Sequence, residues 1–294
     1  MSAALLLRPS HADAYTQPSF KRQFPDIDPF QFKCYGVSAS AEFSGCPSGN
    51  QALYQLYSNF QAIAVASYNL GCFVGAVACI WIGDYLGRRR TIFAGSLIML
   101  VGAVIQASSF SATQLIIGRT VTGIGNGLNT STVPTWQSET SKSHHRGSMV
   151  MIEGMLVTAG VAFSYWLDFG FRALGATSTS WRFPLAFQAV FAIIILSTVL
   201  GLPESPRWLV MKGREQEAKQ VLCALRGQER SSAEIQQELE AVNNAVTEAK
   251  RGSFRELFTM KKESRHFQRT LLACLSQMFQ QISGKFRLYL LPRT

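Results

Sequence analysis

The chain has 294 residues, of which 47% are hydrophobic and 16% charged, and its formal net charge is +10. No charged residue occurs in residues 43–83, 91–118, 120–138 or 183–203. An uncharged, largely apolar run of about 18 residues is long enough to cross the hydrocarbon core of a bilayer as a helix. The composition therefore excludes most soluble enzymes and indicates an all-α, polytopic membrane protein whose first partner is the lipid bilayer.

The apolar runs predict a half-bundle of membrane helices over residues 60–203. Residues 1–59 precede it as an extramembrane segment, residues 204–269 follow it as a helical linker, and residues 270–294 begin a sixth span. The five predicted spans are about 61–82, 91–110, 112–134, 148–170 and 183–203.

Small residues four positions apart predict close contacts between these spans. Gly71 and Gly75 fall in the first predicted span, and Gly123 and Gly127 fall in the third. Because such pairs remove side chains from one face of a helix, they let the backbone of a neighbouring membrane helix approach closely.

Basic residues cluster on alternate connections between the predicted spans. Lys and Arg number three in residues 84–90, two in 139–147 and thirteen in 204–270. Connections on the cytosolic side carry such an excess, so we expect the linker to be cytosolic and the residues before 61 to lie outside. This distribution explains the positive net charge as membrane orientation, and it argues against nucleic acid as a partner.

The linker 204–269 is polar overall, but it carries apolar residues at helical spacing. That spacing is typical of amphipathic helices, and so few large apolar side chains would bury little core in an independent domain. We therefore expect short helices lying under the membrane bundle. The two apolar sets are Ala218, Val221, Leu222 and Leu225, and Ile235, Leu239, Val242 and Val246.

Four motifs lie at the ends of the predicted spans. The first follows the first span and reads Gly83-Asp84-Tyr85-Leu86-Gly87-Arg88-Arg89-Arg90. The second begins at Gly118-Arg119 and continues through Gly123-Ile124-Gly125-Asn126-Gly127 and Pro134-Thr135-Trp136-Gln137-Ser138-Glu139 to Arg146-Gly147. The third and fourth are Pro203-Glu204-Ser205-Pro206-Arg207-Trp208-Leu209 and Gln280-Gln281-Ile282-Ser283-Gly284.

Together these motifs resemble the sugar porter family of the major facilitator superfamily, in its fungal branch. The family patterns are G-D-x-x-G-R-R, G-R-x-x-x-G-x-G, P-x-Y-x-x-E…R-G, P-E-S-P-R-W-L and Q-Q-x-S-G. Each pattern is weak to moderate alone, but all of them in order, each at the matching helix end, are specific. The resemblance covers about residues 15–284 and implies the N-terminal half of a fold in which two six-helix halves bind substrate between them.

The resemblance also implies that this half is incomplete and truncated at both ends. Only fifteen residues precede Thr16, where the family's first helix and its acidic coupling residue belong. After Gly284, where the family continues into an apolar helix, the sequence reads Lys285-Phe286-Arg287. We therefore expect the chain to be a fragment of a transporter.

Opposite charges gather where the spans leave the membrane on the predicted cytosolic side. Such charges can pair across neighbouring helix ends, hold that side of a transporter closed and release when the bundle rocks. The resemblance implies this gate role, and the alternative is that the basic residues only set the orientation. The predicted gate residues are Asp84, Arg88, Glu139, Arg146, Glu204 and Arg207.

Two charges are expected inside the spans. Arg119 precedes Glu139 by 20 residues, about 30 Å along a helix, which places it within the membrane or near its outer edge. In proton-coupled relatives the matching arginine partners an acid on the first helix, and the alternative is snorkelling to the interface. Glu153 lies at a different depth, so we expect no pair with Arg119. Relatives carry a substrate-contacting glutamine at the position of Gly154, and Glu153 is either its replacement or a local polar contact.

Gln280 and Gln281 match the glutamine pair through which the family holds sugar hydroxyls. An amide suits this task because it both donates and accepts hydrogen bonds, as a hydroxyl does. The alternative is that they are glutamines that pack between helices.

The resemblance implies transport of a hexose, pentose or disaccharide by alternating access, with a proton as the coupling ion, in the plasma membrane. A nontransporting nutrient receptor and a non-functional truncated product are the alternatives. The sequence contains neither a nucleophile–base set nor the C-x-x-C spacing of a metal site. We therefore expect no enzymatic activity, no cofactor and no metal.

Overall fold

The computed structural model describes residues 48–141, 145–172, 179–226, 232–251, 268, 271–276 and 278–279. The regular elements among these residues are α-helices, as the sequence predicts. The chain forms two compact units, residues 1–229 and 230–294.

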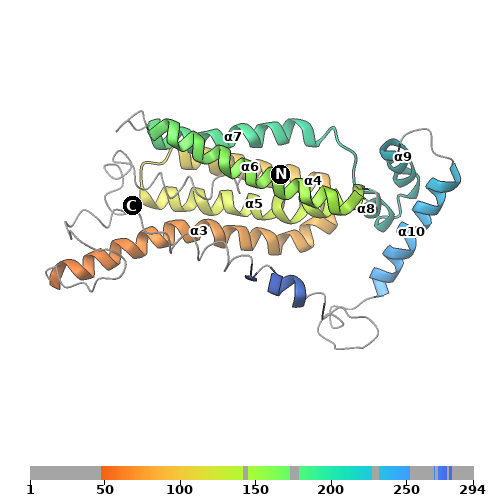
Figure 1. Ribbon diagram of the computed structural model, residues 1–294, viewed down its shortest axis with the longest axis horizontal. Helices are drawn as coiled ribbons and strands as arrows, with labels where there is room; N and C mark the ends of the chain where they lie inside the picture. Colours follow the sequence, from red (N-terminus) through yellow and green to blue (C-terminus); the bar gives the residue numbers. More distant parts are fainter. Residues whose placement is uncertain are drawn as a thin grey trace. The chain divides into compact units, whose positions relative to one another are not determined.

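Among its described residues, the first unit contains five long helices and two short ones. The long helices run roughly along one direction, and α8 lies at one end of them (Figure 1). They are α3 (Ser48–Leu86), α4 (Arg88–Ala107), α5 (Ala112–Thr140), α6 (Arg146–Arg172), α7 (Thr179–Val199), α8 (Pro206–Met211) and α9 (Glu215–Arg226). The second unit contributes α10 (Ser232–Arg251).

Four stretches of the described residues are long and apolar enough to cross a membrane: Ala62–Leu86, Arg88–Ala107, Gly147–Phe171 and Arg182–Val199. They match four of the five predicted spans. The other predicted span, 112–134, falls in α5, which is not among the four because many of its residues are small or polar. Since α5 packs along both α3 and α4, we propose that it crosses the membrane with them.

Several helix ends differ from the predicted boundaries, and two of them have a clear consequence or cause. Helix α3 begins at Ser48 and has 39 residues, about 58 Å at 1.5 Å per residue, so it is longer than the hydrocarbon core requires. Helix α7 ends at Val199, four residues before the predicted end of its span. Gly201 and Pro203 follow, and both residue types disfavour continuation of a helix.

Glycines bring α3 and α5 into direct backbone contact. A Cβ atom on Gly75 would overlap the carbonyl oxygen of Ile124, and one on Gly127 would overlap that of Cys72. Gly71 and Gly123 make the same kind of contact one turn away, so the two helices run parallel. Both predicted glycine pairs therefore lie in one helix–helix interface.

Polar side chains join α5 to α4 on its other side. The Gln106 side-chain amide donates to the carbonyl oxygen of Gly118 at 3.1 Å and to the Thr122 hydroxyl. The Asn129 amide donates to the Ser96 hydroxyl at 3.1 Å. These four side chains are at most 3% exposed, and their hydrogen bonds reduce the cost of burying them. Helix α5 is thus polar where protein, rather than lipid, covers it.

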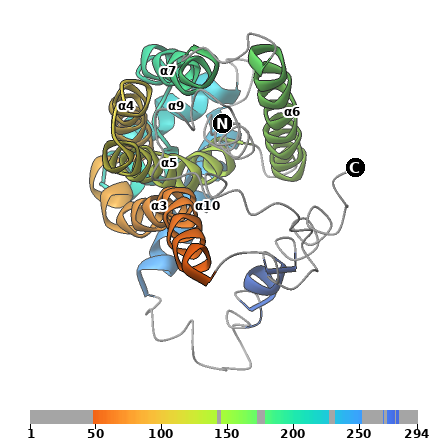
Figure 2. The same ribbon diagram turned by 90° about the vertical axis from the view of Figure 1, so that its left-hand side faces the viewer.

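Helix α6 makes few contacts with the other long helices. Figure 2 shows α6 standing apart from α3, α4 and α5. Aromatic rings join it to α7: Phe163 lies 6.0 Å from Phe187, and Phe171 lies 4.3 Å from Phe183, between ring centroids. Apart from the backbone of α6 itself, no atom of the described residues lies within 4 Å of where a Cβ on Gly154 would be.

The linker helices follow the predicted amphipathic pattern. Ala218 and Leu222 of α9 are 0% and 2% exposed, and Ile235 and Val246 of α10 are 5% and 3% exposed. The residues between them on each helix are mainly exposed. The helical prediction for this part of the linker is confirmed, whereas residues 252–267 lie outside the described residues.

Candidate functional site

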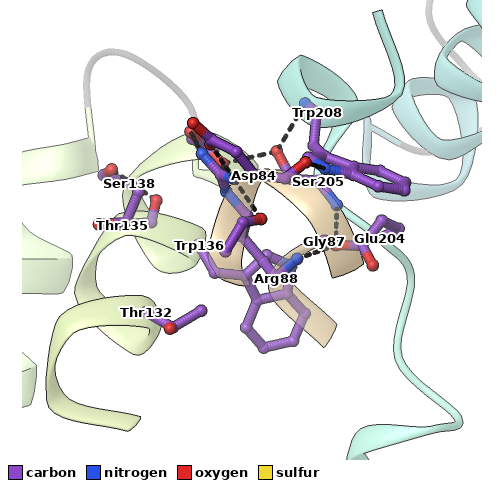
Figure 3. A network of polar contacts seen from close by, with 12 residues as sticks. Asp84, Gly87, Arg88, Thr132, Thr135, Trp136, Ser138, Glu204, Ser205 and Trp208 are labelled. Atoms are coloured by element: carbon purple, nitrogen blue, oxygen red, sulfur yellow. Dashed lines mark hydrogen bonds and ion pairs between the residues drawn. The ribbon is translucent and has the colours of Figure 1, made fainter. Parts of the chain in front are cut away.

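The charge cluster lies where α3 ends, α4 begins, α5 ends and α8 begins (Figure 3). We use the name charge cluster for Asp84, Arg88, Glu139, Glu204 and Ser205. The turn between α3 and α4 is the single residue Gly87, whose φ is +90°. A Cβ there would lie 2.8 Å from a carboxylate oxygen of Glu204. Glycine is therefore required both by the backbone conformation and by the close approach of this carboxylate.

Arg88 is the centre of the cluster. Its Nε donates to Oε2 of Glu139 at 3.2 Å, and its Nη2 donates to Oε1 of the same carboxylate at 3.3 Å. Its Nη1 donates to the Gly83 carbonyl at 2.9 Å and to Asp84 Oδ1 at 3.2 Å. The side chains of Arg88 and Glu139 are 11% and 8% exposed, whereas that of Asp84 is 62% exposed. The bidentate ion pair between Arg88 and Glu139 is therefore largely buried, whereas the ion pair between Arg88 and Asp84 is weakened by solvent.

Glu204, which is distant in sequence, caps the N-terminus of α4. Its Oε1 accepts from the backbone N–H of Arg88 at 2.9 Å and from that of Arg89 at 3.1 Å. The first turn of α4 has no acidic residue, and Gly87 offers no side-chain cap. Free N–H groups and the helix dipole both favour a negative charge at this end. The carboxylate of Glu204 supplies it.

Each of these helix ends carries the wrong charge when considered alone. Helix α4 begins with three arginines, although its N-terminus favours anions, and α5 carries Glu139 in its last turn, although its C-terminus favours cations. In the cluster, Arg88 faces Glu139, and Glu204 faces the α4 N-terminus. The helix ends therefore stabilise one another only while they are together.

Ser205 and Trp208 connect the charge cluster to α8. The Ser205 hydroxyl donates to Glu139 Oε2 at 2.7 Å and accepts from the backbone N–H of Trp208 at 3.3 Å. The indole N–H of Trp208 donates to the Asp84 carbonyl at 3.1 Å. Sequence reasoning missed both residues as members of the site. Serine followed by proline does predict a helix start at Ser205, but no local signal indicates a partner 66 residues away.

Arg89 ties the end of α7 to the start of α4, which sequence reasoning also missed. Its Nη1 donates to the carbonyl oxygens of Leu200 and Leu202, both at 3.2 Å. These two carbonyls lie just past the end of α7. A cation is favoured there because unpaired carbonyls concentrate negative charge at a helix C-terminus.

Two predicted gate residues are not brought into the cluster by the described contacts. Arg207 is half-buried on α8 and forms no ion pair with the part of the chain that the structure describes. Arg146 opens α6, and its side chain lies outside the described residues. The gate role of all six residues stays a prediction.

The two charges predicted inside the spans lie on different helices. Arg119 of α5 is 3% exposed, and its guanidinium carbon lies 5.9 Å from the ring centroid of Tyr68 on α3. Glu153 is half-buried on α6, and no ion pair of the described residues joins it to Arg119. Gln280 and Gln281 lie outside the described residues.

The cluster is suited to holding helix ends together by ion pairs and hydrogen bonds rather than to covalent chemistry. It contains carboxylates, a guanidinium and a hydroxyl that are engaged with one another or with backbone N–H groups. Within the described residues, no group of three or more His, Cys, Asp or Glu side chains is arranged to hold a metal ion.

The helical bundle, with four stretches long and apolar enough to cross a membrane, is that of a multi-pass membrane protein, and comparison with known proteins identifies the family. Residues 33–294 match the family described as "Sugar (and other) transporter", and the chain belongs to that family. The family is one of transporters rather than enzymes.

Relatives of known sequence agree with this assignment. The chain is 40% identical to the sugar transporter STL1 of Saccharomyces cerevisiae over 230 residues, which are 76% of this chain and 40% of that protein. It is 32% identical to the galactose-proton symporter of Escherichia coli over 232 residues, which are 79% of this chain and 47% of that protein. The chain thus spans less than half the length of these relatives.

Solved structures support the fold. The proton:xylose symporter XylE bound to 6-bromo-6-deoxy-D-glucose matches with a TM-score of 0.68 and 20% identity, over 87% of this chain and 54% of that chain. The inward open conformation of XylE from Escherichia coli matches with a TM-score of 0.64 and 21% identity, over 86% and 55%. The sequence resemblance to sugar porters and the prediction of a polytopic helical bundle are confirmed.

Proposed function

We propose that this chain forms part of a sugar transporter that works by alternating access and couples sugar movement to protons. Family membership supports sugar as the class of substrate. The relatives named as a galactose-proton symporter and a proton:xylose symporter support the proton as the coupling ion. The charge cluster is the single observation that carries the mechanism, since its contacts join helix ends that would have to separate in alternating access.

The cluster serves as the cytosolic gate in this proposal. Its contacts join α3, α4, α5 and α8, so they hold these ends in one arrangement against which the rest of a transporter can close. Separating them would leave a shielded arginine, a shielded glutamate and an uncapped helix without partners. Breaking a fully buried ion pair costs about 3–5 kcal/mol, because one charge is left without a partner. In this proposal the four helix ends therefore separate together rather than one by one.

The substrate and coupling residues are assigned by the same proposal. Gln280 and Gln281 hold sugar hydroxyls, because amides match their donor and acceptor pattern. Arg119, buried in α5 against Tyr68, takes part in proton coupling, as intramembrane charges commonly do. The protein lies in the plasma membrane in this proposal. Its linker faces the cytosol, because connections on the cytosolic side carry an excess of Lys and Arg.

A chimera tests the function. In it, the matched residues of this chain replace their counterparts in the Escherichia coli galactose-proton symporter, which supplies the rest of the fold. Purified chimera in proteoliposomes is given labelled galactose, glucose or xylose while external pH is recorded. We expect saturable uptake above empty liposomes, together with alkalinisation of the medium.

Variants of the chimera test the gate. Glu139→Gln should lower the uptake rate at least about tenfold, since 1.4 kcal/mol is a factor of ten and a shielded pair is broken. Glu217→Gln removes a carboxylate whose pair with Arg214 is about half-exposed and should leave uptake unchanged. Sugar binding without uptake by the folded chimera would favour a nontransporting receptor, and equal uptake by both variants would refute the gate.

A further inference from the structure

A lysine is held between two aromatic rings at the corner where α3 meets α8. Lys212 follows the last residue of α8 and is exposed. Its Nζ lies 5.8 Å from the ring centroid of Tyr85 and 5.8 Å from that of Trp208. Because the Trp208 indole is 7% exposed and donates to the Asp84 carbonyl, one of the two rings is fixed. The ammonium group therefore lies near one ring whose position is fixed.

The carboxylates nearest this corner are already engaged. Asp84 accepts from Arg88, and Glu204 accepts from backbone N–H groups at the start of α4. The Lys212 side chain forms no ion pair with the described part of the chain, and the partners given for its ammonium group there are the two rings. Its charge is therefore available to an anion.

An apolar strip of α3 leads away from the same corner. Tyr85 and Trp81 are 79% and 68% exposed, and Leu70 and Val74 are 64% and 49% exposed. These residues are spaced by four, seven and four positions, so they share one face of the helix. All four lie within the stretch Ala62–Leu86, which is long and apolar enough to cross a membrane. Aromatic residues at the end of such a stretch are typical of the membrane–water interface.

We propose that this corner binds an anionic glycerophospholipid, with its phosphate at Lys212 and an acyl chain along Val74 and Leu70. The Lys212 ammonium provides charge complementarity to the headgroup, and the exposed rings of Trp81 and Tyr85 lie at the level between headgroup and chain. A free phosphate ion would use the ammonium alone and would leave the apolar strip uncovered. The apolar strip is the reason for assigning a lipid.

Binding is measured on the complete 294-residue chain in detergent, by native mass spectrometry with added lipid. We expect phosphatidylserine to bind in preference to phosphatidylcholine. Lys212→Gln should weaken phosphatidylserine binding about fivefold, since a lysine near an anionic lipid contributes about 1 kcal/mol and 1.4 kcal/mol is a factor of ten. Lys219→Gln, which removes an exposed lysine of α9 without a ring contact, is the matched control and should change nothing.

Two further measurements separate the sources of the anion. Trp81→Ser should weaken phosphatidylserine binding while the affinity for soluble glycerophosphoserine stays as low as in the parent chain. Both lysine variants should unfold at the parent's temperature, since both side chains are exposed. Equal losses in the two lysine variants, equal binding of phosphatidylcholine, or displacement of the lipid by equimolar glycerophosphoserine would each overturn the proposal. The assay involves no transport, so its outcome is independent of the proposed function.

Discussion

Helices α5 and α6 are neighbours in the chain and nearly equal in length, with 29 and 27 residues, yet they are built in opposite ways. Helix α5 packs against α3 and α4, and it buries polar side chains such as Arg119, Asn126 and Asn129. Helix α6 exposes large apolar side chains such as Met151, Met155 and Trp166. Of these two helices, only α6 is apolar enough to be identified as a membrane span by composition.

The difference shows what apolar composition reports in a membrane bundle. A side chain that faces lipid has no hydrogen-bond partner and must be apolar, whereas one that faces another helix can be polar if a partner is present. Composition therefore measures lipid exposure rather than depth in the membrane. Substitution at a contact of α5, together with substitution at a matched position on α6, tests this contrast between the two helices.

The largest effect is expected at the glycines of the α3–α5 interface. In Gly127→Leu the new side chain would meet the backbone of Cys72, so the helices must separate. Overpacking commonly costs about 1–3 kcal/mol, and we expect the upper end or more because the obstacle is backbone. The change should lower the midpoint of thermal unfolding in detergent, followed by fluorescence-detected gel filtration of a tagged chain.

Gly154→Leu is the control on α6, where nothing lies within 4 Å of the new Cβ. It should match or exceed the parent in stability, because glycine inside a helix costs about 1 kcal/mol relative to a good helix former. Equal destabilisation by the two leucines would show that the close approach of α3 and α5 does not hold the bundle together.

The second comparison sets two glutamates against each other. Glu139→Gln removes the charge that faces Arg88 and Ser205, where the carboxylate is 8% exposed. We expect a loss of roughly 2–3 kcal/mol, between the values for exposed and fully buried pairs. Glu153→Gln, on the half-buried position of α6, should change stability by less than about 0.5 kcal/mol. Similar unfolding midpoints for the two variants would mean that the charge cluster contributes little to stability.

Much of the fold was predictable from the placement of charges. The charge-free run 120–138 predicted a membrane helix, although its apolar composition is too low for it to be identified as a span. The absence of charge is the better signal here because a helix covered by other helices can contain neutral polar side chains. The two glycine pairs predicted close contacts, but not that Gly71 and Gly75 would meet Gly123 and Gly127. Spacing along one helix indicates a contact face, whereas the identity of the partner helix depends on the whole bundle.

The site was predictable in its charged members only. Asp84, Arg88, Glu139 and Glu204 are indicated by the sugar porter motifs and by the opposite charges that these motifs place at neighbouring helix ends, where they can pair. Ser205 was missed, because a neutral hydroxyl at a helix start is fully explained by local capping. Its second bond, to Glu139, depends on how α5 and α8 pack, and this packing has no sequence signal.

A smaller effect is expected at the neutral contact between α4 and α5. Asn129→Ala removes the hydrogen bond to Ser96 at 3.1 Å and should cost about 0.5–1.5 kcal/mol. Thr158→Val on α6 removes an exposed hydroxyl that bonds only within its own helix and should be near neutral. A double-mutant cycle with Ser96→Ala should give a coupling energy of about 1 kcal/mol, and strictly additive losses would contradict a direct contact.

The smallest effect is expected where α6 joins the bundle. Phe187→Leu keeps most of the apolar volume of α7 but removes the ring that lies 6.0 Å from Phe163 and 5.5 Å from Phe191. Such ring pairs contribute about 0.5–1.5 kcal/mol beyond their buried area, and a partly exposed set should lie at the low end. The loss should appear as earlier proteolysis or hydrogen exchange of α6, while exchange of α5 stays slow, because α5 is held by glycine and polar contacts elsewhere. Phe169→Leu is the control, since Phe169 is 71% exposed and its ring contact is with Trp166 of the same helix. If the Phe187 variant instead released α5 and α6 together, the two helices would belong to one cooperative unit, and the contrast between them would be one of composition alone.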